Sequence, residues 1–230
     1  MKHAVVLGAT GAVGSALVRE LLAAPAWASV TIFVRRPTAT FAGARGLEKL
    51  SEHVMHVDHL EHEVAGELAL RRRAQLGAAA AFCTLGVGEP STVSRAELQR
   101  VDVGIAGAFA RGCRMAQVPH FSLLTAVGAN RTSPLHYLRV KGEIESLVGS
   151  LEFGRASFFR PSLLVTRTLR YGFKDRVSQT IFPRLSRFLP SRYREITVEQ
   201  LASAMRINAE QAQPTGIEVL EHADFVRLAA

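Results

Sequence analysis

Cysteine and long apolar runs are both scarce in this sequence. Cys83 and Cys113 are its only two cysteines, so no disulfide framework is indicated and a reducing, cytoplasmic location is expected. No apolar run approaches the roughly 18–20 residues that a transmembrane helix needs. Residues 1–3 lead directly into an apolar strand pattern, so no signal peptide is expected. With 48% hydrophobic residues over 230 positions, the chain is long enough to bury a core as one domain.

Acidic residues are also outnumbered, because 28 lysines and arginines stand against 20 aspartates and glutamates and give a net charge of +8. Residues 166–195 hold much of this excess, with eight basic and two acidic side chains interleaved with aromatic ones. No recognised nucleic-acid-binding motif accompanies them, so we expect a solvated basic face or a rim that attracts phosphate rather than a nucleic-acid site. A protein partner on this segment is the alternative.

A glycine-rich turn follows the first apolar run. Gly8, Gly11 and Gly14 have the spacing GxxGxxG and stand between the apolar residues 4–7 and an alanine-rich helical pattern. Glycines let the backbone reverse tightly and approach a ligand, and the first amides of the following helix point at an anion. An ordinary strand–helix turn is the alternative, but this order of elements favours a site for the pyrophosphate of a dinucleotide.

Apolar runs and helical patterns alternate along the chain. Strands are expected over residues 3–8, 29–34, 53–57, 78–84, 119–125 and 155–160, and helices over residues 12–24, 62–73, 92–116, 134–150 and 197–210. This alternation predicts an α/β fold with a doubly wound parallel sheet of the Rossmann type, whose ligand lies at the carboxyl ends of the strands. Residues 161–230 are expected to form a C-terminal extension of the same domain on the substrate side.

The end of the second expected strand lacks the acidic residue that usually binds the adenosine ribose of NAD. Arg35 and Arg36 stand there instead. A guanidinium is always charged and matches phosphate oxygens, so the two arginines favour NADP, with its 2′-phosphate, over NAD. A pair of solvated arginines in a loop is the alternative.

Two further strand ends are expected to border the adenosine. Asp58 follows the third expected strand, where it either accepts a hydrogen bond from the adenine amino group or caps the next helix. Leu85 and Gly86 follow the fourth, where the glycine lets the backbone approach the ribose and the leucine packs against it.

Tyr137 and Lys141 are four residues apart within a helical pattern and therefore share one helix face. A tyrosine has an ordinary pKa of about 10, and lowering it to about 7 needs roughly 4 kcal/mol, which we expect the lysine, the cofactor charge and partial burial to supply together. Thr125 ends the fifth expected strand, where its hydroxyl is expected to hold a substrate carbonyl oxygen. An amphipathic helix with a half-buried tyrosine and a surface lysine is the alternative.

These segments together resemble the atypical short-chain dehydrogenases/reductases, and within them the branch of Tat-interacting-protein-like oxidoreductases that bind NADPH. The resemblance spans residue 3 to about residue 165, and its most specific part is the run YLxVKGExE over residues 137–145. The other matching segments are residues 8–14, 34–36, 83–86, 121–125, 128–130 and 159–164.

The resemblance implies roles for individual residues. On this basis Thr10, Gly11, Ala12 and Val13 contact the pyrophosphate, Arg35 and Arg36 the 2′-phosphate, Leu85 and Gly86 the adenosine, Tyr137 and Lys141 the nicotinamide ribose, and Leu164 the nicotinamide. Two positions depart from the family pattern. Thr125 stands where a serine is usual, and residues 92–116 lack the asparagine with which many of these enzymes hold a proton-relay water, although Asp102 is nearby.

The leading hypothesis is an NADPH-dependent oxidoreductase that reduces a small-molecule carbonyl substrate with Thr125, Tyr137 and Lys141. The alternative is a catalytically weak or inactive NADPH-binding sensor or regulatory scaffold. No metal site is expected, and neither the substrate nor the oligomeric state can be predicted from the sequence.

The assignment of Arg35 and Arg36 predicts tighter binding of NADPH than of NADH. Titration of the purified protein with each reduced cofactor, followed by cofactor fluorescence, measures this preference. Equal affinities would contradict the assignment.

Overall fold

A seven-stranded parallel sheet forms the centre of the molecule. The computed structural model describes residues 2–73, 80–162, 164–165, 194–211 and 215–229. The strands of the sheet are β1 (Lys2–Leu7), β2 (Trp27–Val34), β3 (Leu50–Val54), β4 (Ala80–Cys83), β5 (His120–Leu124), β6 (Arg155–Phe159) and β9 (Gly216–Leu220). Their spatial order is β3-β2-β1-β4-β5-β6-β9, so the chain builds outward from β1 in one direction and then returns to continue in the other. The predicted doubly wound sheet is confirmed.

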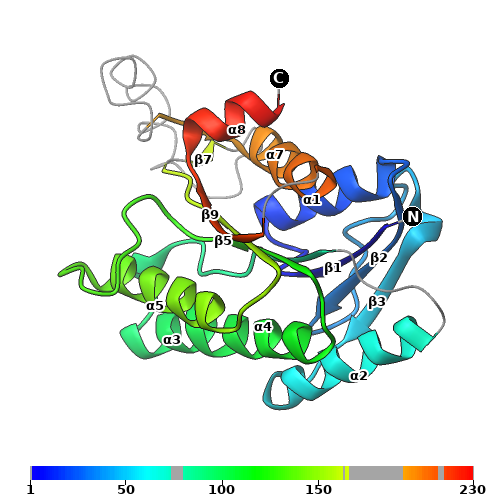
Figure 1. Ribbon diagram of the computed structural model, residues 1–230, viewed down its shortest axis with the longest axis horizontal. Coiled ribbons are helices and arrows are strands. Elements are labelled where there is room, and N and C mark those ends of the chain that lie inside the picture. Colours follow the sequence, from blue (N-terminus) through cyan, green and yellow to red (C-terminus); the bar gives the residue numbers. More distant parts are fainter. Residues whose placement is uncertain (1, 74–79, 163, 166–193, 212–214, 230) are drawn as a thin grey trace.

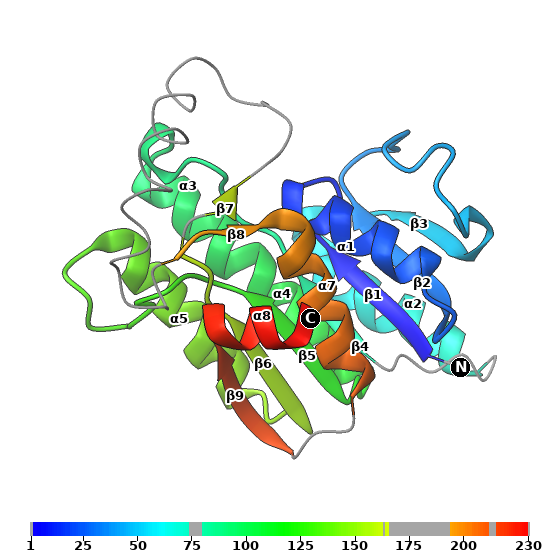
Figure 2. The ribbon, with the colours of Figure 1, turned by 90° about the horizontal axis from the view of Figure 1, so that it is seen from above.

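Helices cover both faces of the sheet (Figure 1). One face carries α1 (Ala12–Ala23), α7 (Val198–Glu210) and α8 (His222–Ala229), and the other carries α2 (Leu60–Arg73), α4 (Ala106–Met115) and α5 (His136–Ser150). The short helix α3 (Arg95–Gln99) and a six-residue π-helical turn, η4 (Arg100–Ile105), lead into α4. Figure 2 shows the two helical layers from above. Across the described ranges, no helix combines the length and apolarity needed to cross a bilayer.

Alternation along the strands builds a separate core on each face. In β1, Ala4 and Val6 pack into the core under α1 and α7, whereas Val5 and Leu7 pack into the core under α2 and α4. Successive side chains of a strand point to opposite faces, so a strand buried on both sides must be apolar throughout. This is why the apolar runs of the sequence are continuous rather than alternating.

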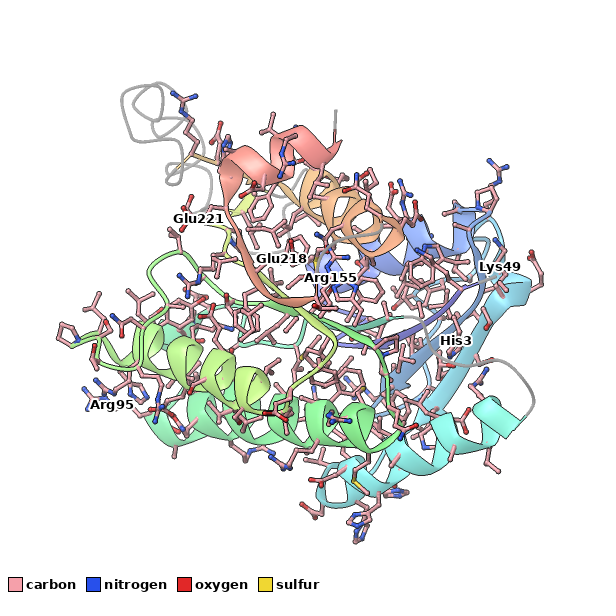
Figure 3. All side chains as sticks on the ribbon, in the orientation of Figure 1. His3, Lys49, Arg95, Arg155, Glu218 and Glu221 are labelled. Atoms are coloured by element: carbon pink, nitrogen blue, oxygen red, sulfur yellow. The ribbon has the colours of Figure 1, made fainter. Side chains whose placement is uncertain are left out.

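The edge strand β9 was not predicted from the sequence. Its Ile217 and Val219 are 58% and 44% exposed, so it lacks the continuous apolar run of the inner strands. Polar contacts attach it instead, because Glu218 accepts hydrogen bonds from Arg155 (Nε, 2.8 Å) and Ser157 (Oγ, 2.6 Å) of β6. Figure 3 labels Arg155 and Glu218, which lie together between the sheet and α7.

The region after residue 160 is built partly into the main domain. Helices α7 and α8 pack on the sheet in the same core as α1, and β9 completes the sheet. A second, two-stranded sheet pairs β7 (Leu164–Val165) with β8 (Ile196–Thr197) in parallel. Residues 166–193, and with them almost all of the basic segment, lie outside the described residues.

Candidate functional site

The turn between β1 and α1 lies directly against the end of β4. Gly8 has a φ of +85°, and a Cβ there would come within 2.5 Å of the Leu85 nitrogen. A Cβ on Gly14 would overlap the Gly8 carbonyl oxygen and lie 2.6 Å from Thr84 Oγ1. The Thr84 hydroxyl in turn donates a hydrogen bond to the Leu7 carbonyl oxygen (3.1 Å). Only glycine fits at these two positions, which explains two of the three glycines of the motif.

The first turn of α1 leaves its backbone amides open. Gly11 is the N-cap, no side chain caps the helix, and its first turn holds no acidic residue. Thr10, Gly11 and Ala12 are exposed, so the loop can approach a ligand, whereas Val13 is buried and offers only its backbone. Open amides carry the partial positive charge of the helix end. This arrangement fits a pyrophosphate, which would satisfy amides that no side chain among the described residues caps.

Arg35 and Arg36 are exposed immediately after β2, as expected. Glu97 of α3 faces this region. Hydrogen bonds from the Arg100 guanidinium (2.8 Å to each carboxylate oxygen) hold the pKa of Glu97 below its usual value, with a smaller contribution from Arg35. The sequence did not predict that Glu97 and Arg100 lie near Arg35, because α3 and η4, which carry them, come about sixty residues later in the chain.

Asp58 lies in the 3-10 turn η2 (Val57–His59), and its side chain is exposed. Glu63, rather than Asp58, accepts a hydrogen bond from the backbone amide of His56, just before this turn (3.0 Å). No hydrogen bond to the Asp58 carboxylate occurs within the described part of the chain, so the structure does not show it capping a helix. Its contact with adenine stays a prediction.

The loop after β4 lies on a buried ion pair. Leu85 is half-buried against the core, and Gly86 is exposed. A Cβ on Gly86 would lie 3.3 Å from both Asp102 Oδ1 and Lys141 Nζ. The expected adenosine-side loop therefore passes close to the lysine of the expected reactive centre.

Asp102 was noted in the sequence without a location, and the structure provides one. It lies in the π-helical turn η4, where its carboxylate accepts a hydrogen bond from Lys141 Nζ. The Lys141 and Asp102 side chains are only 7% and 1% exposed. The other Asp102 oxygen accepts the backbone amide of Val87 (3.2 Å), so Asp102 joins α5, η4 and the β4 loop. Single π-helical turns often occur at functional sites.

Tyr137 lies one helical turn before Lys141, whose ammonium nitrogen is 5.7 Å from the centre of the phenol ring. Burial raises the pKa of Tyr137, the Lys141 charge lowers it, Asp102 raises it again, and the net effect is a raised pKa. For Lys141, burial lowers the pKa, but attraction to Asp102 and Tyr137 holds it above its usual value. The expected contribution of burial to lowering this pKa was wrong in sign, because burial disfavours the phenolate, and Asp102 offsets the lysine charge. A fall of the pKa with the cofactor bound stays a prediction.

Thr125 follows β5 directly, and its hydroxyl binds groups of the protein itself. Its hydroxyl donates to Glu145 Oε1 (2.7 Å), and the same carboxylate is held by the Arg160 guanidinium (Nε, 2.9 Å). Glu145 lies two helical turns, about 12 Å along the helix axis, beyond Tyr137. Through Glu145 and the Phe159 carbonyl oxygen (3.3 Å), Thr125 joins the ends of β5 and β6 to α5. Its expected contact with a substrate oxygen stays a prediction.

Leu164 begins the short strand β7 and is 36% exposed, on the side of the sheet where the strands end. Its expected contact with nicotinamide stays a prediction. The expected basic rim or partner surface over residues 166–195 cannot be placed, since 166–193 are not among the described residues.

The sequence from residue 8 to residue 148 matches the profile of the NAD(P)H-binding family. The chain belongs to this family. The matched range begins at Gly8 and contains the open α1 turn, the Asp102–Lys141 pair and Tyr137. The geometry at this edge of the sheet is thus consistent with NAD(P)H binding.

Relatives of this NAD(P)H-binding protein confirm the resemblance to the atypical short-chain dehydrogenase branch. It is 31% identical over 168 residues to the rat protein HTATIP2, covering 71% of this chain and 63% of that protein. It is 28% identical over 177 residues to the mitochondrial protein FMP52 of Candida albicans, covering 76% of this chain and 73% of that one. The alignment thus spans less than two thirds of the rat protein.

Solved structures share the fold of this NAD(P)H-binding protein. MoeE5 in complex with UDP-glucose and NAD has a TM-score of 0.66 at 16% identity, covering 99% of this chain and 80% of that one. UDP-glucuronic acid 4-epimerase from Bacillus cereus in complex with NAD has a TM-score of 0.69 at 11% identity, covering 95% and 77%. At these identities the likeness shows the Rossmann-like fold alone.

The expected cytoplasmic location is contradicted by the fungal relatives. The proteins of Scheffersomyces stipitis, Candida albicans and Aspergillus fumigatus are named as mitochondrial. The scarcity of cysteine indicates only a reducing environment, which does not separate these compartments, and the cytoplasmic assignment is withdrawn.

Gly14→Ala should destabilise the protein by about 1–3 kcal/mol and weaken cofactor binding, because the new Cβ would overlap the Gly8 carbonyl and Thr84. Gly66→Ala is the matched control, since Gly66 lies in α2 with nothing within 4 Å of an added Cβ. That change should be neutral or stabilise by up to about 1 kcal/mol. Chemical denaturation measures both, and equal effects of the two changes would contradict the close packing of the turn.

Thr125→Val should lower the melting temperature, because it leaves the buried Glu145 without one of its donors. Thr125→Ser keeps the hydroxyl and should restore most of the loss. Cofactor affinity should stay unchanged in both, as measured by fluorescence titration. A Thr125→Val protein that melts like the wild type but loses cofactor binding or turnover would show that Thr125 acts in binding or in the reaction rather than in stability.

Proposed function

We propose that this protein is an NADPH-dependent reductase of a small-molecule carbonyl compound. The observation that carries the proposal is Tyr137, a partly buried phenol with a raised pKa, in contact with the buried Lys141 at the carboxyl edge of the sheet. A phenol that keeps its proton at neutral pH suits proton donation better than proton abstraction. The same edge carries the open amides of α1, so a dinucleotide bound there would extend toward Tyr137.

The protons and hydrogen-bond donors that each residue carries indicate its role. Bound NADPH would supply the hydride that reduces the carbonyl carbon. Tyr137 then donates its proton to the carbonyl oxygen, and the positive charge of Lys141 favours the phenolate that is left. Lys141 has three N–H donors, of which Asp102 accepts one, so two can bind hydroxyls of the nicotinamide ribose.

NADPH, rather than NADH, is the reductant in this proposal. Support comes from the two exposed arginines that follow β2, Arg35 and Arg36, and from the lack of an acidic residue beside them in the sequence. Glu97 reduces the preference for NADPH over NADH, because its carboxylate already interacts with the Arg35 charge. A 2′-phosphate would compete with Glu97 for Arg35 and gain a charge-assisted hydrogen bond.

The second candidate is an NADPH-binding sensor or scaffold without turnover. Thr125 favours it, since the hydroxyl that would complete the reacting group is committed to Glu145. Oxidation of bound NADPH in a single turnover, with a panel of aldehydes, ketones and quinones, separates the two candidates. Tight cofactor binding with no oxidation by any compound would support the sensor.

Tyr137→Phe should abolish turnover while changing NADPH affinity less than about fivefold, because it removes the proton donor and only one of the ribose contacts. Stopped-flow oxidation of NADPH and a binding titration on the same sample measure the two effects. Turnover that persists in this variant would refute the proposed role of the phenol.

Replacing Arg35 and Arg36 together by Ala should weaken NADPH binding by about 10–100-fold and leave NADH binding nearly unchanged. Arg227→Ala is the control, because it removes a positive charge from the exposed surface of α8 and should alter neither affinity. Parallel loss of both cofactors in the double variant would mean that the arginines do not read the 2′-phosphate.

A further inference from the structure

The Asp102 carboxylate occupies a junction between three elements of the site. Lys141 of α5 donates to one of its oxygens, and the Val87 amide of the β4 loop donates to the other at 3.2 Å. The backbone of Gly86 rests on the pair, where a Cβ would be 3.3 Å from both charged atoms. The side chain of Asp102 is 1% exposed, so its contacts are shielded from bulk solvent.

A buried ion pair in this position needs an explanation beyond stability. Removing two charges from water costs several kcal/mol each, and the attraction between them repays this only in good geometry. A pair of apolar side chains of similar volume is often equally stable. The contacts with the Val87 amide and the phenol of Tyr137 indicate that the pair has a positional role.

The ionisable groups around the Tyr137–Lys141 pair come from three elements. Lys141 lies on its own helix, Asp102 lies on η4, and Cys83 at the end of β4 faces Lys141. Burial raises the pKa of the Cys83 thiol to about 12, so it carries no charge at physiological pH. Among the described residues, the balance at the phenol is therefore set by the Lys141 cation and the Asp102 anion.

We infer that Asp102 is a positioning residue of this site, which holds Lys141 and the Val87 amide in place and offsets part of the lysine charge so that Tyr137 remains a proton donor. Asp102 touches neither substrate nor the reacting atoms and acts through Lys141. The inference rests on the proposed function, because Tyr137 needs to stay protonated only if it donates a proton to the substrate. The inference also predicts the direction of catalysis, because a phenol that retains its proton can protonate the product of carbonyl reduction but cannot act as the base that oxidation needs.

The decisive experiment measures the ionisation of Tyr137 in the protein without cofactor or substrate. Tyrosinate absorbance is recorded against pH, and subtracting the curve of the matching Tyr137→Phe protein isolates this residue from the two other tyrosines. Asp102→Asn keeps the shape but removes the charge, so the midpoint should move to lower pH. Asp102→Glu keeps the charge and should stay closer to the wild type.

Glu145→Gln provides the matched control, because Glu145 is another buried, paired carboxylate, and it lies on α5 itself. It should lower the melting temperature without moving the Tyr137 midpoint. If Asp102→Asn moves the midpoint no more than Glu145→Gln does, the inference is overturned. If Asp102→Asn does not fold, Asp102→Ser takes its place, and a Tyr137 midpoint that moves no more than in Glu145→Gln would also overturn the inference.

Turnover provides the second measurement. In the wild type the rate of reduction should persist into alkaline pH, and in Asp102→Asn its alkaline decline should begin at lower pH with kcat affected more than KM. Because the titration is read without cofactor, a wild type that reduces nothing would defeat the proposed function, whereas an unmoved Tyr137 midpoint would defeat the role of Asp102.

Discussion

The close approach of the β1–α1 turn to the end of β4 determines the geometry of the whole site. Gly8 and Gly14 leave no room for a Cβ between the turn and residues Thr84 and Leu85. This contact fixes where the open amides of α1 lie, and the next residue of the β4 loop, Gly86, rests on the Asp102–Lys141 pair. One backbone contact therefore connects the phosphate end of the site with its reactive end, and a change at either glycine would disturb both.

Two buried carboxylates on or against α5 have different consequences. Glu145 binds Thr125 and Arg160 and joins strand ends to the helix, two turns away from the phenol. Asp102 binds Lys141 beside the phenol and therefore changes the charge that Tyr137 experiences. The distance from Tyr137, rather than burial or pairing, separates a structural carboxylate from one that influences the chemistry, because electrostatic effects fall with separation.

The sequence predicted the parts of the structure that local patterns encode. Apolar runs identified six of the seven strands of the main sheet, although β3 occupies residues 50–54 rather than the expected 53–57. The glycine spacing located the β1–α1 turn, and the four-residue spacing placed Tyr137 and Lys141 on one face of α5. It missed β9, whose attachment depends on Glu218 rather than on apolar residues. It could not give the partner of Thr125 or the location of Asp102, because the groups they bind lie 20 and 39 residues away and only the fold brings them together.

The central claim is that one dinucleotide spans from the first turn of α1 to Tyr137. Titration of NADPH into ¹⁵N-labelled protein, followed by amide chemical shifts, tests it directly. The account predicts that the largest changes occur at Gly11 and Ala12, at Gly86 and Val87, and around Lys141, and that they saturate together. Changes confined to other surfaces, or changes at α1 without any at Lys141, would contradict the account.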